Sequence, residues 1–410
     1  MRTVLEEIVP SKEESKVLKS AANHFVKKLN SELKSANAVV GGSVAKDTFL
    51  KGDFDIDIFV QFEKEKYKNK DISQILHSKL KSIFKSASKI SGLHKVHGSR
   101  DYFQIRQDPF TFEVIPILKI IKAKEAENIT DISPLHTVFV KEHSHLTDEI
   151  RLTKAFCKAN KLYGAESYIR GFSGYTLEVL TIAHNSFENL MKAASRWKPG
   201  MRIDVKNHGV KDLNKSKLSP LIVIDPVQPD RNTAAALSEK KFDDFVNLAK
   251  EFLRNPSPDF FKQIKFDVER IKSASILRII PSDGKEDIVG AKLIKCMEYI
   301  HKKLKEEGYE VTENDWHWDD KEAYFWYFVK DKNLSHEKKH YGPPAKEGKH
   351  LDEFMKKYSG YSIKEEGFRV YVELKRKHTN INNFLKELVE KDGYIKEKVR
   401  EIKVLLERKN

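Results

Sequence analysis

Two short motifs near the start of the chain combine residue types that can bind phosphate groups and a metal ion. A Gly-Gly-Ser turn at residues 41–43 lets the backbone approach phosphate oxygens closely, and Ser43 adds a hydroxyl and an N–H. An Asp-x-Asp-x-Asp run follows, and because side chains in a strand repeat every second residue, Asp53, Asp55 and Asp57 are expected on one face. Clustered carboxylates repel one another unless a cation lies between them, and oxygen ligands favour Mg²⁺. Together the motifs predict a site for Mg²⁺ and a triphosphate, whereas either alone is typical of an ordinary turn or a solvated strand face.

A third carboxylate for the same site is Glu113, the one acid in the apolar, strand-like run 111–116. A second strand is expected just before it, at residues 102–106. A carboxylate is expensive to bury without a partner, so a metal ion or a lysine is the expected neighbour. The alternative is a glutamate on an edge strand that faces water.

Composition favours a polyanionic partner. The 410 residues, enough for about two to four domains, include 75 Lys and Arg against 61 Asp and Glu, a formal net charge of +14. An excess of this size indicates nucleic acid, although lysine-rich helix faces are the alternative. Cys157 and Cys296 define neither a disulfide framework nor a zinc site. With no membrane-spanning apolar run and no signal peptide, a cytoplasmic location is expected.

The order of the expected elements predicts an α+β chain of three domains. Residues 1–140 alternate helices and strands around the two motifs, as in a catalytic α/β domain. Residues 141–257 are mostly helical, with one long helix from Ser173 to about Trp197, and end at an Asn-Pro-Ser-Pro break. Residues 258–410 begin with a strand–helix–strand–strand–helix–strand series, which is the ferredoxin-like order. Its elements are expected at 275–280, 287–307, 309–314, 322–329, 349–358 and 368–374, followed by helices at 380–390 and 394–409.

Several segments, spread in order over nearly the whole chain, carry specific motifs. The most specific are Arg-Gly-Phe-Ser-Gly-Tyr at 170–175 and Asp-Pro followed by Arg-Asn-x-Ala-Ala within 225–235. The others are Gly42-Ser43 to Thr48 with Asp55-Ile56-Asp57, Pro134-Leu135-His136, Lys158 to Glu166, and Tyr341-Gly342-Pro343-Pro344. Together these segments resemble the class I or archaeal-type CCA-adding enzymes, which are tRNA nucleotidyltransferases of the polymerase β-like nucleotidyltransferase superfamily.

This resemblance implies template-independent addition of C, C and A to the 3′ end of tRNA from CTP and ATP. Asp55, Asp57 and Glu113 would hold two Mg²⁺ ions, one activating the tRNA 3′-hydroxyl and the other neutralising the triphosphate and the leaving pyrophosphate. In this family the third carboxylate is usually Asp, and Arg is common where this chain has Lys46. The implied nucleotide-binding residues are Gly42, Ser43, Lys46, His136, Lys154, Tyr163, Asp225 and Arg231, the last reading the Watson–Crick edge of the base.

Because every tRNA is a substrate of such an enzyme, the RNA is expected to be held by its backbone and shape. The basic loop 196–217 in the central, nucleotide- and tRNA-binding domain and a turn at 338–344 in the C-terminal, RNA-binding domain suit this role. The candidate RNA contacts are Arg196, Lys198, Arg202, Lys339 and Tyr341. A homodimer is one possible assembly.

Alternative interpretations stay open at this point. The chain is alternatively a poly(A) polymerase or an oligoadenylate synthetase, which share the Gly-Ser and carboxylate core, or a tRNA-binding protein whose catalytic site has decayed. For single residues, Lys154 is alternatively part of a solvated helix stripe with Lys158, Tyr163 is alternatively core packing, and Arg231 is alternatively a salt-bridge partner of Asp225.

Overall fold

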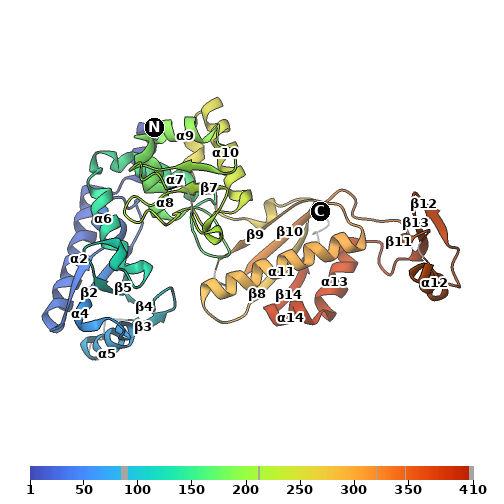
Figure 1. Ribbon diagram of the computed structural model, residues 1–410, viewed down its shortest axis with the longest axis horizontal. Coiled ribbons are helices and arrows are strands. Elements are labelled where there is room, and N and C mark those ends of the chain that lie inside the picture. The colour runs from blue at the N-terminus through green and yellow to red at the C-terminus, as the bar shows by residue number, and fades with distance from the viewer. Residues whose placement is uncertain (85–90, 211–212, 320, 347, 406–410) are drawn as a thin grey trace. The chain divides into compact units, whose positions relative to one another are not determined.

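The computed structural model describes residues 1–84, 91–210, 213–319, 321–346 and 348–405 (Figure 1). The chain forms two compact units, residues 1–264 and 265–410. Both units combine helices with sheets, which confirms the α+β prediction; the finer division into three domains stays a prediction. Within the described ranges, no helix is both long and apolar enough to cross a membrane.

The first unit contains a five-stranded sheet in the order β1-β2-β5-β4-β3. Strands β2 and β5 are parallel, and the other neighbours are antiparallel. On β2 the even-numbered residues from Ile56 to Phe62 are buried against helices α2 and α5, so the odd-numbered residues lie on the opposite face. The strands are β1 (Ala36–Val40), β2 (Asp55–Glu63), β3 (Ser91–Val96), β4 (Tyr102–Gln107) and β5 (Phe110–Lys119).

The helix α2 (Lys12–Glu32) begins with the capping box that Ser11 and Glu14 predict. Ser11 N donates to Glu14 Oε2 at 2.7 Å, and Glu14 N donates to Ser11 Oγ at 3.1 Å. The helix then buries Leu18, Phe25 and Leu29 against the sheet. Capping and apolar spacing thus fix one layer over the face of β2 that carries no carboxylates.

The rest of the first unit is mostly helical. Helices α7 to α10 share one core, in which Phe156, Leu180 and Phe245 are fully buried. The single helix expected from Ser173 to Trp197 is two helices, because Asn185 takes a left-handed backbone conformation (φ 59°) that ends the first. The helices are α1 (Arg2–Ile8), α3 (Gly42–Lys46), α4 (Lys64–Tyr67), α5 (Ile72–Phe84), α6 (Ser133–Lys141), α7 (Thr147–Ala159), α8 (Gly174–His184), α9 (Phe187–Ala194) and α10 (Glu239–Arg254), with a small parallel sheet of β6 (Met201–Ile203) and β7 (Leu221–Val223).

The second unit has a four-stranded antiparallel sheet in the order β14-β8-β10-β9. With β8, β9, β10 and β14 taken as first to fourth in the chain, this order is 4-1-3-2, the ferredoxin-like arrangement. The elements are β8 (Ser275–Pro281), α11 (Glu286–Glu307), β9 (Val311–Trp318), β10 (Ala323–Val329), β11 (Glu337–Pro344), α12 (Gly348–Lys357), β12 (Lys364–Glu366), β13 (Arg369–Lys375), α13 (Ile381–Lys391), α14 (Gly393–Lys398) and β14 (Val399–Leu405).

The fourth strand of this sheet is not the one that the sequence predicts. The strand predicted at 368–374 corresponds to β13 (Arg369–Lys375), which belongs to a separate sheet, β11-β13-β12, inserted with α12 between β10 and α13. The helix predicted at 394–409 ends at Lys398, and Val399–Leu405 pairs with β8 instead; residues 406–409 lie outside the described residues. The apolar residues of 399–405 fit both a helical and a strand period. Because the edge of β8 would otherwise be unpaired, pairing with it selects the strand.

The two ends of this insertion lie next to each other. Leu334 N donates to Thr379 O at 2.8 Å, and Asn333 forms an isolated antiparallel bridge with Asn380. The chain therefore leaves the ferredoxin-like sheet and returns to it at nearly the same place.

Candidate nucleotide and metal site

Strands β2 and β5 bring the predicted carboxylates onto one face of the first sheet. Asp57 lies in register with Glu113 on the parallel neighbour β5, and Asp55 lies in register with Thr111. Glu113 Oε1 accepts a hydrogen bond from Gln104 Nε2 on β4 at 2.8 Å. Ile56, Ile58, Phe112 and Val114, which flank these acids within the strands, are buried in the helix-covered core, so the acids point away from it.

Asp53 does not lie on the strand that carries Asp55 and Asp57, contrary to the sequence prediction. Strand β2 begins only at Asp55, and Asp53 closes the preceding turn, where its carboxylate accepts from Leu50 N at 3.2 Å. Its other oxygen pairs with Lys158 at 2.8 Å. The alternating acidic residues of the sequence therefore begin at Asp53, two residues before the strand begins at Asp55.

The glycine turn is shaped around the carboxylate strand. Gly41 N donates to Asp57 O at 2.8 Å, which ties the turn to β2. Gly42 has a positive φ of 55°, and a Cβ built on it would lie 1.6 Å from Asp57 Oδ2. Ser43 follows in the first turn of α3. Only glycine at position 42 allows this turn to approach the carboxylate so closely.

The carboxylates of Asp55 and Asp57 both have a raised pKa. Burial raises the pKa of Asp57, the Asp55 charge adds to this, and Lys46 opposes it. Burial and the charge of Asp53 likewise raise the pKa of Asp55. Among the described residues, no three His, Cys, Asp or Glu side chains are gathered closely enough to hold a metal as they stand. The donor set is nevertheless all oxygen, and a hard divalent cation would relieve both shifts.

A buried ion cluster that the sequence did not predict lies beside this face. Glu178 on α8 is 1% exposed, and its two oxygens each lie 2.7 Å from a lysine ammonium, Lys46 on one side and Lys154 on the other. Thr48 Oγ1 also donates to it at 2.9 Å. Burial alone would raise the pKa of Glu178, but Lys154 and Lys46 outweigh it and lower that pKa to about 2. The available signal was a lone acid within the apolar helix 174–184.

Lys154 is therefore not part of a solvated stripe. The residue is 4% exposed, whereas the side chain of Lys158, one helical turn further on, is 24% exposed. Lys158 Nζ lies 5.1 Å from the ring centroid of Tyr163, and burial raises the pKa of that tyrosine. A Cβ on Gly174 would lie 2.7 Å from Tyr163 Oη, so the ring packs against the start of α8.

Asp225 is the centre of a second buried cluster. Its carboxylate lies 3.0 Å from His136 Nε2 and accepts from Tyr175 Oη at 3.1 Å and from Arg231 at 2.9 Å. Burial opposes ionisation, but the hydrogen bond from His136 and the charges around it lower the pKa of Asp225 to about 2. Burial lowers the pKa of His136, and the hydrogen bond to Asp225 opposes this. Because a carboxylate oxygen accepts, Nε2 is the donor of that hydrogen bond.

Tyr175 joins the two clusters. Its ring stacks on His136 with centroids 3.9 Å apart, and Lys46 Nζ lies 5.6 Å from its centroid. The residue was part of the segment 170–175 but was not predicted as a site residue. The structure thus brings Lys46, Lys154, His136, Asp225 and Arg231 together. Arg231 does form the salt bridge with Asp225 that was the alternative interpretation, and this bridge does not prevent it from binding a nucleotide.

The candidate RNA contacts are all exposed. Those of the first unit, Arg196, Lys198 and Arg202, lie in the loop region around β6, of which residues 211–212 lie outside the described residues. In the second unit, Lys339 and Tyr341 both contact Glu366. The turn predicted at 338–344 is instead the strand β11.

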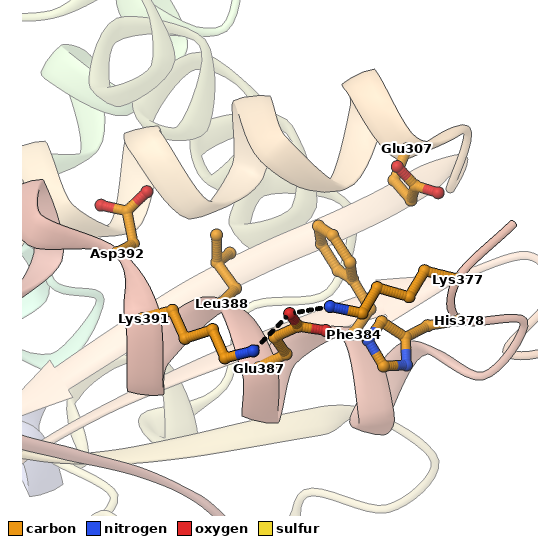
Figure 2. Close-up of a pocket in the computed structure, with 8 residues that line it drawn as sticks. All are labelled: Glu307, Lys377, His378, Phe384, Glu387, Leu388, Lys391 and Asp392. Atoms are coloured by element: carbon orange, nitrogen blue, oxygen red, sulfur yellow. Dashed lines mark hydrogen bonds and ion pairs between the residues drawn. The ribbon is translucent and has the colours of Figure 1, made fainter.

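A pocket of about 310 Å³ in the second unit contains none of the predicted site residues (Figure 2). It is lined by Lys377, His378 and Lys391, and all three contact Glu387. Hydrogen bonds from these residues, His378 first, lower the pKa of Glu387 to about 2. Glu387 thus contacts both lysines and the histidine of this pocket, which the carboxylates of Glu307 and Asp392 also line.

Comparison with known proteins identifies a sequence family in each part of the chain. Residues 22–130 match the nucleotidyltransferase domain, 148–262 match the second domain of tRNA nucleotidyltransferase, and 277–404 match the C-terminal domain of CCA-adding enzymes. A solved structure of Cid1, named for its RNA terminal uridylyl transferase activity, covers 65% of this chain and 97% of its own. Its TM-score is 0.51 at 11% identity, so this likeness shows the fold alone.

Two archaeal relatives cover almost the whole chain. The CCA-adding enzyme of Nanoarchaeum equitans is 37% identical over 374 residues, which are 89% of this chain and 91% of the relative. That of Methanocaldococcus jannaschii is 31% identical over 95% of this chain and 90% of its own. Since the match extends through both units, the chain belongs to the family of CCA-adding enzymes, the tRNA nucleotidyltransferases.

Proposed function

We propose that this protein adds C, C and A to the 3′ end of tRNA, without a template, from CTP and ATP. The tRNA 3′-hydroxyl attacks the α-phosphate of the nucleotide, and pyrophosphate leaves. The observation that carries the proposal is the register of Asp57 with Glu113, directly beside the Gly42 turn. It brings the acidic residues of two distant sequence motifs to the turn that would approach the triphosphate.

Asp55, Asp57 and Glu113 would hold Mg²⁺. When bound, the cation would polarise the phosphate and offset the charge that develops on the oxygens. The carboxylate of Glu113, which has one methylene more than the usual Asp, is oriented by the hydrogen bond from Gln104. The oxygen-only donors of this face favour Mg²⁺ over softer metals.

The nucleotide would lie against the two buried clusters. Gly42 and Ser43 present backbone N–H groups to the phosphates, and Lys46 and Lys154 belong to the cation cluster beside them. His136 and Tyr163 would contact the ribose and the phosphates. Arg231 is fixed by Asp225 through one N–H, which leaves donors of its planar fork for the Watson–Crick edge of C or A.

The RNA would be held without reading its bases. Exposed cations on both units and one aromatic ring on the second unit would contact it. Arg196, Lys198 and Arg202 serve on the first unit, and Lys339 and Tyr341 serve on the second. Such contacts follow the backbone and shape of any tRNA. The cytoplasm is the proposed location, and a homodimer is the proposed assembly to test.

The test supplies a tRNA that lacks its 3′ end, Mg²⁺, and CTP alone, ATP alone or both nucleotides. Growth by C, C and A followed by arrest is the expected result. Partial growth would restrict the activity to the nucleotides added, and a long A tail would indicate a poly(A) polymerase. Tight tRNA binding without any growth would indicate a decayed site.

A further inference from the structure

We propose that Arg106 binds the backbone phosphate that precedes the 3′-terminal nucleoside of the tRNA, and so holds the 3′-hydroxyl over the face that carries Asp55, Asp57 and Glu113. Arg106 is an exposed residue of β4 and was not predicted as a site residue or an RNA contact. This inference rests on the proposed function and assigns a contact for the RNA beside the carboxylates.

The two substrates must approach the carboxylates from different sides of β2. Strand β1 lies on one side of β2 and strand β5 on the other. The glycine turn follows β1 and is tied to β2, since Gly41 N donates to Asp57 O at 2.8 Å. In an in-line displacement the attacking and leaving oxygens lie opposite each other. With the triphosphate at the glycine turn, the attacking hydroxyl therefore has to come from the side of β5 and β4.

Arg106 lies on that side and on the same face as the carboxylates. Asp55 is in register with Thr111 on β5, and Thr111 is in register with Arg106 on β4. These three residues thus form one row across three neighbouring strands. Ile105, the neighbour of Arg106, is fully buried in the helix-covered core, so Arg106 faces the other way.

The spacing within this row suits one nucleoside. Two strand spacings, about 9–10 Å, separate the α carbons of Asp55 and Arg106. A nucleoside separates a 3′-hydroxyl from the phosphate on its 5′ side. With the hydroxyl at the carboxylates, that phosphate would lie toward β4, where the long side chain of Arg106 can reach it.

The guanidinium of Arg106 is available for a phosphate. Burial, first, and the charge of Asp53 raise the pKa of Asp55, whereas the charges of Lys158 and Arg106 lower it, so both cations are close enough to act on this site. Lys158 Nζ already lies 2.8 Å from Asp53 Oδ1. Arg106, in contrast, has no hydrogen bond or ion pair with any residue that the structure describes. Its planar fork of donors matches the oxygens of a phosphate.

The test combines a protein variant with a modified RNA. A tRNA that lacks its 3′ end is prepared with either an ordinary phosphate or an uncharged methylphosphonate before its 3′-terminal nucleoside. Binding to the full-length protein is measured at one fixed salt concentration, without CTP or ATP. The methylphosphonate is expected to weaken wild-type binding about fivefold, and Arg106→Gln should weaken binding of the ordinary tRNA about as much. Arg106→Gln should then bind the two RNAs within about twofold of each other, because the contact is already lost.

Two further measurements separate this contact from other effects of Arg106→Gln. The melting temperature and the CTP affinity should both stay as in the wild type, because Arg106 is exposed and lies across β2 from the glycine turn. A methylphosphonate placed three linkages further from the 3′ end should affect the wild type and Arg106→Gln equally.

The matched control is Arg254→Gln. Arg254 is an exposed arginine at the end of α10 in the same unit, so its substitution changes the net charge by the same amount. This variant should keep the full effect of the terminal methylphosphonate. If it lost that effect as well, net charge would explain the result and the proposal would be overturned.

Two other results would overturn the assignment of Arg106. In one, the wild type binds the ordinary and the modified tRNA equally; in the other, the methylphosphonate weakens Arg106→Gln as much as the wild type. Since these measurements need no nucleotide transfer, they are separate from the proposed function. A protein that shows the expected binding pattern but never extends tRNA would contradict that function and still support the contact.

Discussion

The carboxylate of Asp57 occupies the space that a side chain at position 42 would need. A Cβ on Gly42 would lie 1.6 Å from Asp57 Oδ2, and the φ of Gly42 is +55°. The glycine turn and the carboxylate strand are therefore one steric unit. Any residue other than glycine would displace the carboxylate or open the turn.

Gly42→Ala is expected to abolish nucleotide transfer and to lower the free energy of unfolding by about 2–4 kcal/mol, through backbone strain and the clash together. Denaturant unfolding and tRNA extension measure the two effects. Gly209→Ala is the control, because Gly209 has a positive φ of 67° but open space around its Cβ position. An active Gly42→Ala enzyme would show that the turn does not depend on this close approach.

Asp57→Asn is expected to reduce transfer at least about a hundredfold, since it removes a charged oxygen from the centre of the proposed cation site. Affinity for tRNA should change little, because the exposed basic candidates lie elsewhere. Asp53→Asn is the matched control: Asp53 precedes the strand and pairs with Lys158, so transfer should persist within a few-fold. Equal losses in the two variants would place Asp53 back in the site.

Divalent-cation affinity is expected to fall with decreasing pH sooner than it would for ordinary aspartates. Burial raises the pKa of Asp55 and of Asp57, so protons compete with the cation at a higher pH. Calorimetric titration with Mg²⁺ between pH ~4 and pH ~8 tests this. Asp57→Asn should weaken the pH dependence, and a flat wild-type profile in the upper half of that range would contradict the shift.

The strand β14 can be tested by its alternation. Ile402 and Val404 pack against the core of the second unit, whereas Lys403 between them is exposed. Val404→Asp should lower the free energy of unfolding by about 1–3 kcal/mol, and Lys403→Gln should be nearly neutral. Similar losses in both variants would argue against a strand at this position.

Local patterns predicted the carboxylate face well. The positions of Asp55, Asp57 and Glu113 follow from the strand period and from the apolar residues that flank them, because these residues must face the helices. The same period failed at Asp53, because the hydrogen bond from Leu50 N closes a turn there. Where a strand begins depends on hydrogen bonds such as this one, and these cannot be read from the repeat of residue types in the sequence.

Contacts between distant segments explain what the sequence did not reveal. In the sequence, Glu178 is a lone acid in an apolar helix. Its partner Lys46 is distant in the sequence, and its partner Lys154 lies on another helix. Residues 399–405 fit a helical or an extended period equally, and only the open edge of β8 selects the strand. Both decisions are made by tertiary structure.

The adjacent ends of the insertion between β10 and α13 make the second unit modular. Asn333 and Asn380 already face each other, so a short turn joining them would close the ferredoxin-like sheet without residues 334–379. The inserted residues still contact the end of α11, where Lys338 and Arg376 both pair with Glu307. Lys339 and Tyr341, the proposed RNA contacts of this unit, both lie in the inserted part.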